Sequence, residues 1–454
     1  MTQSLAFMKI PAFLLLLGSI TLSIVAESNW PQYRGPQASG VSDGAAAPTR
    51  WNIETGENIH WRTAIPGLAH SSPIVWNEQV YVITAVRPGK ADLKVGLYGD
   101  IESANDQEVH QWRLLALNKS DGKVLWDKLG HEGVPKVKRH TKASHANSSP
   151  ATDGRRITAL LGSEGLFCFD MEGQLLWKKE LGPMDAGYYV VPSAQWGFAS
   201  SPVIHEGKVF VLCDVQTNSF LAAFNLEDGK ELWRTARKDV PTWGTPTVVQ
   251  VGGENQILVN GWHHIGAYDL KTGAEIWKLN GGGDIPVPTP IVSGDLAYFT
   301  SAHGSSRPMR AIRLTAKGDI TPPDVGATNS AIAWAHARQG NYMQTPIVVG
   351  QNIYGCADSG VLTCFDAKTG AIHYSERLSN KGEGFTASPV SDGRNLYFAS
   401  ELGNVYVVPA STKFAVSASN SLDETCMASP AISNGVLYFR MRENLIAIGS
   451  KAKP

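Results

Sequence analysis

The sequence predicts an all-β protein, a single eight-bladed β-propeller in which each blade is a four-stranded sheet. Three observations predict it: a Ser/Thr-Pro pair that recurs eight times, a Gly placed four residues before a Trp in four copies, and a strand-like segment near the N-terminus that completes the last repeat. Repeats of about 40 residues are typical of propellers. The chain has 454 residues, 43% hydrophobic and 18% charged, which is enough to bury a large core.

The Ser/Thr-Pro pair marks where the first strand of each blade begins. A short apolar stretch follows each proline, and a run of β-branched and aromatic residues comes after it, as at Val80–Thr84 and Val209–Leu212. Six of the seven spacings between these prolines lie between 41 and 56 residues, which suits one four-stranded blade each. The prolines are Pro73, Pro150, Pro202, Pro246, Pro290, Pro346, Pro389 and Pro430.

The third and fourth strands of a blade are predicted on either side of a tight turn. A Gly in that turn can adopt positive φ, and the Asp, Asn, Thr or Glu before it suits a turn. The four copies pair Gly122 with Trp126, Gly173 with Trp177, Gly229 with Trp233, and Gly273 with Trp277. A fifth copy at Gly370 has Tyr374 in place of the Trp. We expect these rings to wedge between neighbouring blades.

The last repeat lacks a fourth strand after Leu445–Gly449, and the N-terminal segment Ile53–Trp61 has the T-G…W form of that strand. We therefore expect the N-terminal strand to complete the eighth blade. Closing the ring in this way removes the exposed sheet edges of an open array.

The repeated pattern A-x-D-x-x-T-G-x-x-x-W resembles the pyrroloquinoline-quinone (PQQ) repeat. That repeat is shared by the quinoprotein alcohol dehydrogenases and the BamB-type outer-membrane assembly factor, both eight-bladed propellers. The segments N-W-P-Q-Y-R-G-P, G-G-G-D-I-P-V-P-T-P and N-Y-M-Q-T-P are similar to those of exported bacterial PQQ-like propellers. The resemblance implies the fold directly, but the repeat alone does not specify an activity.

The sequence predicts two parts of the chain: residues 1–26 form a signal peptide, and residues 27–454 form the propeller. Lys9 precedes the apolar run Ile10–Val25, which ends at Ala26 before polar residues, as in secretory signals. We expect a periplasmic or secreted protein with no membrane span after cleavage. The five cysteines are scattered without C-x-x-C, and buried thiols are the first expectation, although one disulfide would suit an oxidising compartment. A formal net charge of −1 argues against a nucleic-acid partner.

One face of the ring is the predicted binding face. Connections between the second and third strands, and between successive blades, lie on the same face, and the long ones are Arg87–Gln111, Gly130–Asn147 and Gly182–Phe198. Aromatic and polar residues in these loops converge on the axis, as in ligand sites. The alternative is that the rings only plug the channel mouth. The candidate ligand-binding residues are His70, His145, Asn147, Trp196, Trp243, Trp262, His263, His264, His303, Tyr342 and Phe385.

The function expected from these features is that of an exported, non-enzymatic, monomeric propeller that binds a protein partner or a small organic ligand. No catalytic motif and no metal-ligand spacing accompany the repeat. The alternative is a PQQ-dependent alcohol dehydrogenase, with Ca²⁺ as its cation. The family's dehydrogenases are typically longer and carry an adjacent Cys-Cys pair, which this sequence lacks. Asp284, Asp358 and Glu383 are the acids that could serve that chemistry.

Overall fold

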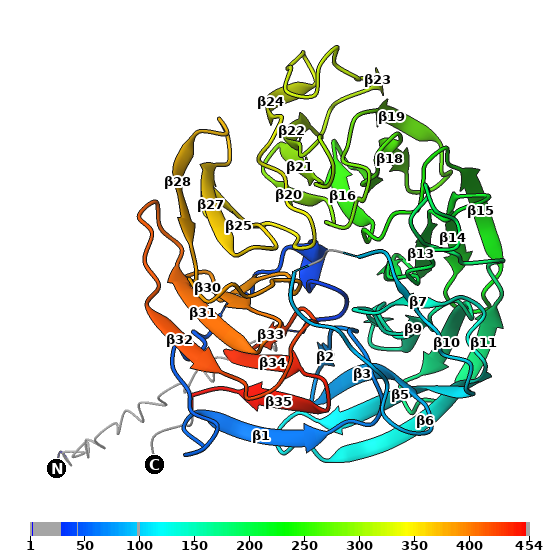
Figure 1. Ribbon diagram of the computed structural model, residues 1–454, viewed down its shortest axis with the longest axis vertical. Coiled ribbons are helices and arrows are strands. Elements are labelled where there is room, and N and C mark those ends of the chain that lie inside the picture. The colour runs from blue at the N-terminus through cyan, green and yellow to red at the C-terminus, as the bar shows by residue number, and fades with distance from the viewer. Residues whose placement is uncertain (1, 3–28, 43, 98–99, 451–454) are drawn as a thin grey trace.

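The protein is a closed ring of eight four-stranded antiparallel sheets, which confirms the predicted propeller (Figure 1). The structure is a computed structural model that describes residues 2, 29–42, 44–97 and 100–450. Apart from residue 2, the signal peptide expected at residues 1–26 lies outside the described residues. No helix in the described part of the chain is long and apolar enough to cross a membrane.

The strands of each of the first four blades follow one another in chain order from the axis outward. Blade one consists of β2 (Ile74–Trp76), β3 (Gln79–Val86), β5 (His110–Asn118) and β6 (Val124–Gly133). Blade two consists of β8 (Ala151–Thr152), β9 (Arg156–Leu160), β10 (Leu166–Asp170) and β11 (Leu175–Lys179). Blade three consists of β12 (Val203–His205), β13 (Lys208–Cys213), β14 (Phe220–Asn225) and β15 (Glu231–Ala236). Blade four consists of β16 (Thr247–Val251), β17 (Glu254–Val259), β18 (Ile265–Asp269) and β19 (Glu275–Leu279), and β23 (Gly318–Asp319) adds a short parallel strand outside it.

The other four blades repeat this order. Blade five consists of β20 (Ile291–Ser293), β21 (Leu296–Thr300), β22 (Met309–Arg313) and β24 (Ile332–His336). Blade six consists of β25 (Ile347–Val349), β26 (Asn352–Cys356), β27 (Val361–Asp366) and β28 (Ile372–Arg377). Blade seven consists of β29 (Val390–Ser391), β30 (Asn395–Ala399), β31 (Asn404–Pro409) and β32 (Ala418–Ser421). Blade eight consists of β33 (Ala431–Ser433), β34 (Val436–Arg440), β35 (Asn444–Ile448) and β1 (Ile59–Ala64).

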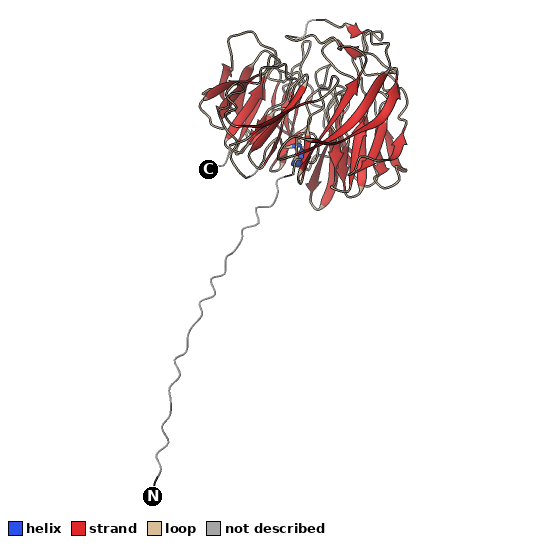
Figure 2. Cartoon of the chain, turned by 90° about the horizontal axis from the view of Figure 1, so that it is seen from below, coloured by secondary structure: helices blue, strands red, loops and turns tan. Residues whose placement is uncertain are grey.

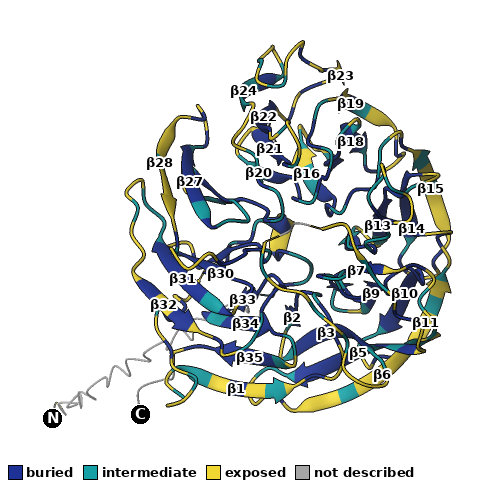
Figure 3. Ribbon diagram, viewed as in Figure 1, coloured by how far each residue is buried: buried dark blue, intermediate teal, exposed yellow. Residues whose placement is uncertain are grey.

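The ring is closed by the N-terminal strand. β1 pairs antiparallel with β35, with Arg62 opposite Ile446 and Ala64 opposite Asn444, so the first strand of the chain is the outermost strand of the last blade. The middle strands are buried between neighbouring blades, whereas outer strands such as β11 and β28 are largely exposed (Figure 3). All five cysteines are buried and unpaired, as the apolar runs around most of them indicated.

The repeated Trp residues, with the exception of Trp277, pack against the turn glycine of the next blade. A Cβ on Gly229, whose φ is +70°, would lie 2.8 Å from Cδ2 of Trp177, so no side chain fits there. The Trp177 indole Nε1 also donates to the Leu226 carbonyl at 3.1 Å. The same contact joins Trp61 to Gly122, Trp126 to Gly173, Trp233 to Gly273 and Trp334 to Gly370.

The Ser/Thr-Pro pairs form a ring of hydrogen bonds around the axis. The backbone N–H of Ser72 donates to the Ser149 Oγ at 2.9 Å, and the N–H of Ser149 donates to the Ser201 Oγ at 2.9 Å. The same bond continues from blade to blade through Thr245, Thr289, Thr345, Ser388 and Ser429. Seven of the eight hydroxyls receive the N–H of the preceding blade, which accounts for the Ser or Thr at these positions. The Ser72 hydroxyl has no partner among the described residues, so the ring of bonds is open between blades eight and one.

The N-terminal segment closes one end of the axis. The 3₁₀ turn η1 (Pro36–Ala38) lies near the centre of the ring (Figures 1 and 2). Next to it, the buried Arg34 guanidinium donates to the carbonyls of Pro346 at 3.0 Å and Pro389 at 3.2 Å. Burial lowers the pKa of Arg34 to about 10, and its bonds to backbone carbonyls satisfy the group without a carboxylate. The axial space therefore opens on the opposite, loop-bearing face.

Candidate functional site

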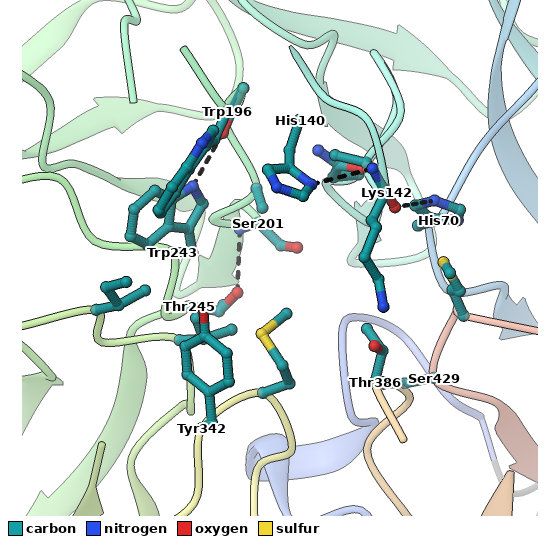
Figure 4. A pocket seen from close by; sticks show the side chains of 18 of the residues that line it. His70, His140, Lys142, Trp196, Ser201, Trp243, Thr245, Tyr342, Thr386 and Ser429 are labelled. Atoms are coloured by element: carbon teal, nitrogen blue, oxygen red, sulfur yellow. Dashed lines mark hydrogen bonds between the residues drawn. The ribbon is translucent and has the colours of Figure 1, made fainter. Parts of the chain in front are cut away.

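The axial face holds a cavity of about 170 Å³ above the ring of Ser and Thr hydroxyls (Figure 4). Loops from most of the blades line it, and Tyr33 of the N-terminal segment also lines it. The insertion in blade one passes over the same face, because β4 (Ser103–Ala104) pairs with β7 (Arg139–His140). The three long loops predicted for this face thus meet, as the Ser103 hydroxyl donates to the Gln195 carbonyl at 2.7 Å.

Five of the eleven predicted residues line this cavity: His70, Asn147, Trp196, Trp243 and Tyr342. Figure 4 shows the labelled side chains among them around a common space. A sixth, His303, lines an adjoining cavity of about 350 Å³ that shares Trp196 and Tyr342 with the first. In this second cavity His303 Nδ1 lies 2.9 Å from Asp284 Oδ1.

The other five predicted residues line neither of these two cavities. Trp262 and His263 stack on each other with ring centroids 3.8 Å apart, and His264 bonds to Glu275 at 2.5 Å. Phe385 is buried against Gly360 and Tyr406 as a core residue. His145 is also buried, and its Nε2 faces Asp106.

An aromatic wall forms one side of the axial cavity. The rings of Tyr188 and Trp196 are stacked, with centroids 5.4 Å apart and an interplanar angle of 7°, and Trp196 contacts Trp243 at 5.7 Å. The two indole N–H groups donate to the carbonyls of Ile101 and Gly197, at 3.3 and 2.9 Å. These bonds fix the rings, so the wall presents flat apolar surface to the cavity.

A buried ion pair lies on the other side. Lys142 Nζ donates to the two Glu401 carboxylate oxygens at 2.8 and 2.9 Å, and both side chains are less than 5% exposed. Glu401 also accepts bonds from the Thr386 hydroxyl at 2.5 Å and the Gly96 N–H at 2.6 Å. The pair therefore fastens the blade-one insertion, which carries Gly96, to blade seven. The positive charge of Lys142 and the negative charge of Glu401 neutralise each other within this buried pair.

His70 is a neutral member of the lining. Burial lowers the pKa of its imidazole to about 3, although its hydrogen bond to the Lys142 carbonyl opposes this shift. The Nε2 atom lies 3.1 Å from that carbonyl oxygen, which can only accept a bond. His70 is thus the neutral Nε2–H tautomer at physiological pH.

Asp106, His110 and His145 form a buried cluster beneath the insertion, with their ligand atoms within 4.8 Å of one another. The carboxylate of Asp106 already binds Arg139 Nε at 2.7 Å and Arg87 Nη1 at 2.9 Å. The neighbouring His145 ring and the Arg139 charge hold the pKa of Asp106 well below its usual range, while burial lowers the pKa of His145. Two guanidinium groups on the same carboxylate disfavour a cation there, so the cluster anchors the insertion by ion pairing.

Sequence reasoning missed the hydroxyl ring and the Lys142–Glu401 pair as parts of this site. The basic run at residues 136–142 has the composition of a solvated loop, yet Arg139, His140 and Lys142 are buried. Glu401 lies about 260 residues away in a different blade, so no local spacing connects it to Lys142. The recurrence of Ser/Thr before every Pro was the available signal for the hydroxyl ring.

The lining residues do not fit PQQ with Ca²⁺, the group that the family resemblance implies. Ca²⁺ prefers six to eight oxygen ligands with several carboxylates. Among the described residues that line the axial cavity, Asp100 is the one carboxylate, and it bonds to Lys94 at 3.2 Å. Glu401 lies behind Lys142 with both oxygens occupied, and Asp284, Asp358 and Glu383 lie outside the axial lining.

Comparisons with known proteins agree with the fold. The tetrathionate hydrolase of Acidithiobacillus ferrooxidans is 22% identical over 276 residues, which span 58% of this chain and 47% of that protein, about half its length. The BamB assembly factor of Shewanella oneidensis is 22% identical over 300 residues, 63% of this chain and 70% of that protein. A europium-containing methanol dehydrogenase superposes with a TM-score of 0.62 at 11% identity, covering 93% of this chain and 89% of that chain, which shows a shared fold.

A family model described as "Outer membrane protein assembly factor BamB" matches residues 39–211 and 116–376. These two overlapping matches cover well over half of the chain and fall on the blades that carry the repeated Gly and Trp. The chain therefore belongs to this family of PQQ-repeat β-propellers.

Proposed function

We propose that this protein is an exported, non-enzymatic binding protein that holds a small organic ligand in its axial cavity, in the periplasm or outside the cell. The observation that supports it best is the lining itself: an aromatic wall of Trp196 and Trp243 faces a set of hydroxyl groups in a dead-end space. Concave sites with aromatic walls and a few fixed polar groups are typical of ligand binding.

The size and cover of the cavity favour a small ligand over a protein segment. At about 170 Å³ it is smaller than the roughly 300–1,000 Å³ of sites for drug-sized ligands. The insertion of blade one covers the entrance and is fastened through Gly96 to the Lys142–Glu401 pair. A protein partner, as the name BamB assembly factor suggests for the relative, would contact the outer surface of these loops instead.

The experiment that tests the proposal is a titration of purified protein with a library of neutral, anionic and cationic organic compounds, followed by tryptophan fluorescence. We expect at least one compound to change the emission of the wild type. The change should be lost in Trp243→Ala, and it should remain in Trp262→Ala, a Trp on the same face outside both cavities. Thermal unfolding of both variants checks that they are folded.

Two outcomes would contradict the proposal. One is a library without any compound whose effect depends on Trp243. The other is reduction of an electron-acceptor dye by an alcohol after addition of PQQ and Ca²⁺, which would favour the dehydrogenase alternative over the binding protein.

A further inference from the structure

The charged groups around the axial cavity are already neutralised. Lys142 is held by Glu401, and Asp100 bonds to Lys94 and lies 3.5 Å from His140 Nε2. Burial lowers the pKa values of both His70 and His140, so these rings are neutral at physiological pH. A charged ligand group would enter the described lining without an opposite charge to balance it, which is strongly unfavourable in a buried place.

The floor of the cavity offers hydroxyl groups. Ser72 is 1% exposed, lines the cavity, and its Oγ has no hydrogen-bond partner among the described residues. The ring of hydrogen bonds is therefore open at this point, between Ser429 of blade eight and Ser72 of blade one. The hydroxyls of Ser201, Thr245 and Ser429 each accept a backbone N–H, and in the described structure none of them donates its own hydrogen to a protein group.

These unfulfilled hydroxyls point to a ligand. Buried polar atoms in proteins nearly always have a partner, and a hydroxyl can both donate and accept. Because Ser72 lines the cavity, a ligand held there can supply the partner that its hydroxyl lacks. A ligand with hydroxyl groups of its own can meet donors and acceptors alike without bringing a charge.

The opposite wall requires a flat apolar surface on the same ligand. Both indole N–H groups of the wall are already bonded to carbonyls, and Tyr188 covers one side of Trp196. Trp196 and Trp243 both line the cavity from this wall, and Ile285 and Met343 add apolar surface to the lining.

We propose that the axial cavity binds an uncharged, hydroxyl-bearing ring compound with the chemistry of a neutral sugar. The ring stacks against Trp243, and its hydroxyl groups bond to the hydroxyls of Ser72 and Ser429. This proposal rests on the proposed function, because it specifies the ligand class of the same cavity.

The test is calorimetric titration of the wild-type protein with glucose, galactose, mannose and N-acetylglucosamine, beside their charged counterparts glucuronate, galacturonate, mannuronate and glucosamine. We expect at least one neutral sugar to bind, and its charged counterpart to bind at least about tenfold more weakly. Equal or tighter binding of the charged counterpart would overturn the assignment of an uncharged ligand.

The variant Ser72→Ala locates the sugar. Its hydroxyl makes no bond within the described protein, so the variant should unfold at the wild-type temperature or slightly above it. We expect its affinity for the neutral sugar to fall by about three- to tenfold, the effect of one hydrogen bond. Ser71→Ala is the matched control, since the neighbouring Ser71 is equally buried but does not line the cavity.

The outcomes separate the two proposals. If no neutral sugar binds, while another compound of the library binds in a Trp243-dependent way, the sugar assignment is wrong and the binding function stands. If Ser72→Ala binds the sugar as the wild type does, the sugar lies elsewhere and the assignment is also wrong. If no compound in the library depends on Trp243, the binding function itself fails.

Discussion

Single hydroxyl groups hold the centre of this molecule together. Each Ser or Thr before a Pro, except Ser72, receives a backbone N–H from the neighbouring blade, so one side chain satisfies a buried donor that has no partner in its own sheet. The bond links two blades at the axis, where the inner strands are only two to five residues long.

The variant Ser149→Ala tests this role. Removing the hydroxyl leaves the buried Ser72 N–H without its acceptor at 2.9 Å, so we expect the free energy of unfolding to fall by about 1–3 kcal/mol. Urea unfolding measures it. Ser149→Thr keeps the hydroxyl, as the Thr residues of blades four to six do, and should stay within about 1 kcal/mol of the wild type. An equal loss in both variants would contradict the hydroxyl ring.

The neutral His70 makes stability depend on pH. Its folded pKa of about 3 is below the usual value of 6.5, so below pH 6.5 the unfolded chain takes up a proton that the folded chain does not. The contribution is fully present above pH 6.5 and is lost as the pH falls from 6.5 toward 3, by at most about 1.4 kcal/mol per pH unit.

We expect His70→Gln, which keeps a donor for the Lys142 carbonyl, to lose less stability than the wild type between pH 7 and pH 4.5. Urea unfolding at several pH values measures the difference in slope. Parallel curves for the two proteins would show that His70 is not held neutral by the fold.

At the scale of strands and turns, the Trp–Gly contact determines how closely one blade packs against the next. Gly229 and Gly207 have nearly the same φ, +70° and +69°. A Cβ at Gly229 would lie 2.8 Å from Cδ2 of the Trp177 ring. A Cβ at Gly207 would have no neighbouring atom within 4 Å. The two glycines therefore separate backbone strain from packing.

We predict that Gly229→Ala lowers the free energy of unfolding by about 1–3 kcal/mol more than Gly207→Ala. Both variants share the strain of an L-residue at positive φ, about 1 kcal/mol or more. Thermal or urea unfolding measures the difference. Equal losses of unfolding free energy in the two variants would mean that the Trp177 ring moves aside without destabilising the fold. The repeated Gly would then be needed only for the positive φ of the turn.

Closure by β1 can be tested by shortening the chain. A protein that begins at Ile65 lacks β1 and the Arg34 segment, so β35 becomes an exposed edge and one end of the axis opens. We expect a lower and broader thermal transition and oligomers in size-exclusion chromatography. The control begins at Asn29 and retains β1. An unchanged transition in the shorter protein would contradict closure by the N-terminal strand.

For the molecule as a whole, the repeat is enough to predict the fold because its signals are local. The turn glycines, the Trp register and the Ser/Thr-Pro pairs each lie within one blade, and eight copies allow the ring to be counted. The exposed turn of blade five, with β23 in it, interrupts the repeat, which is why the sequence pattern does not place Trp334 in that register.

The site is predictable only in part, because its partners come from different blades. His70, Asn147, Trp196, Trp243 and Tyr342 precede Ser/Thr-Pro pairs by a few residues and so reach the axis. Phe385 shares that position but turns into the core, and His145 turns toward Asp106. Which way such a side chain turns depends on the blade-one insertion and its ion pairs, and these contacts span up to about 300 residues.

The most direct test of the central claim is a crystal structure of the protein with the compound that gives the strongest Trp243-dependent change in fluorescence. We predict electron density for the compound in the axial cavity, beside Trp243 and within hydrogen-bond distance of the Ser72 and Ser429 hydroxyls. Density for the compound on the outer loops, with only water at Ser72, would contradict the claim that the axial cavity is the binding site.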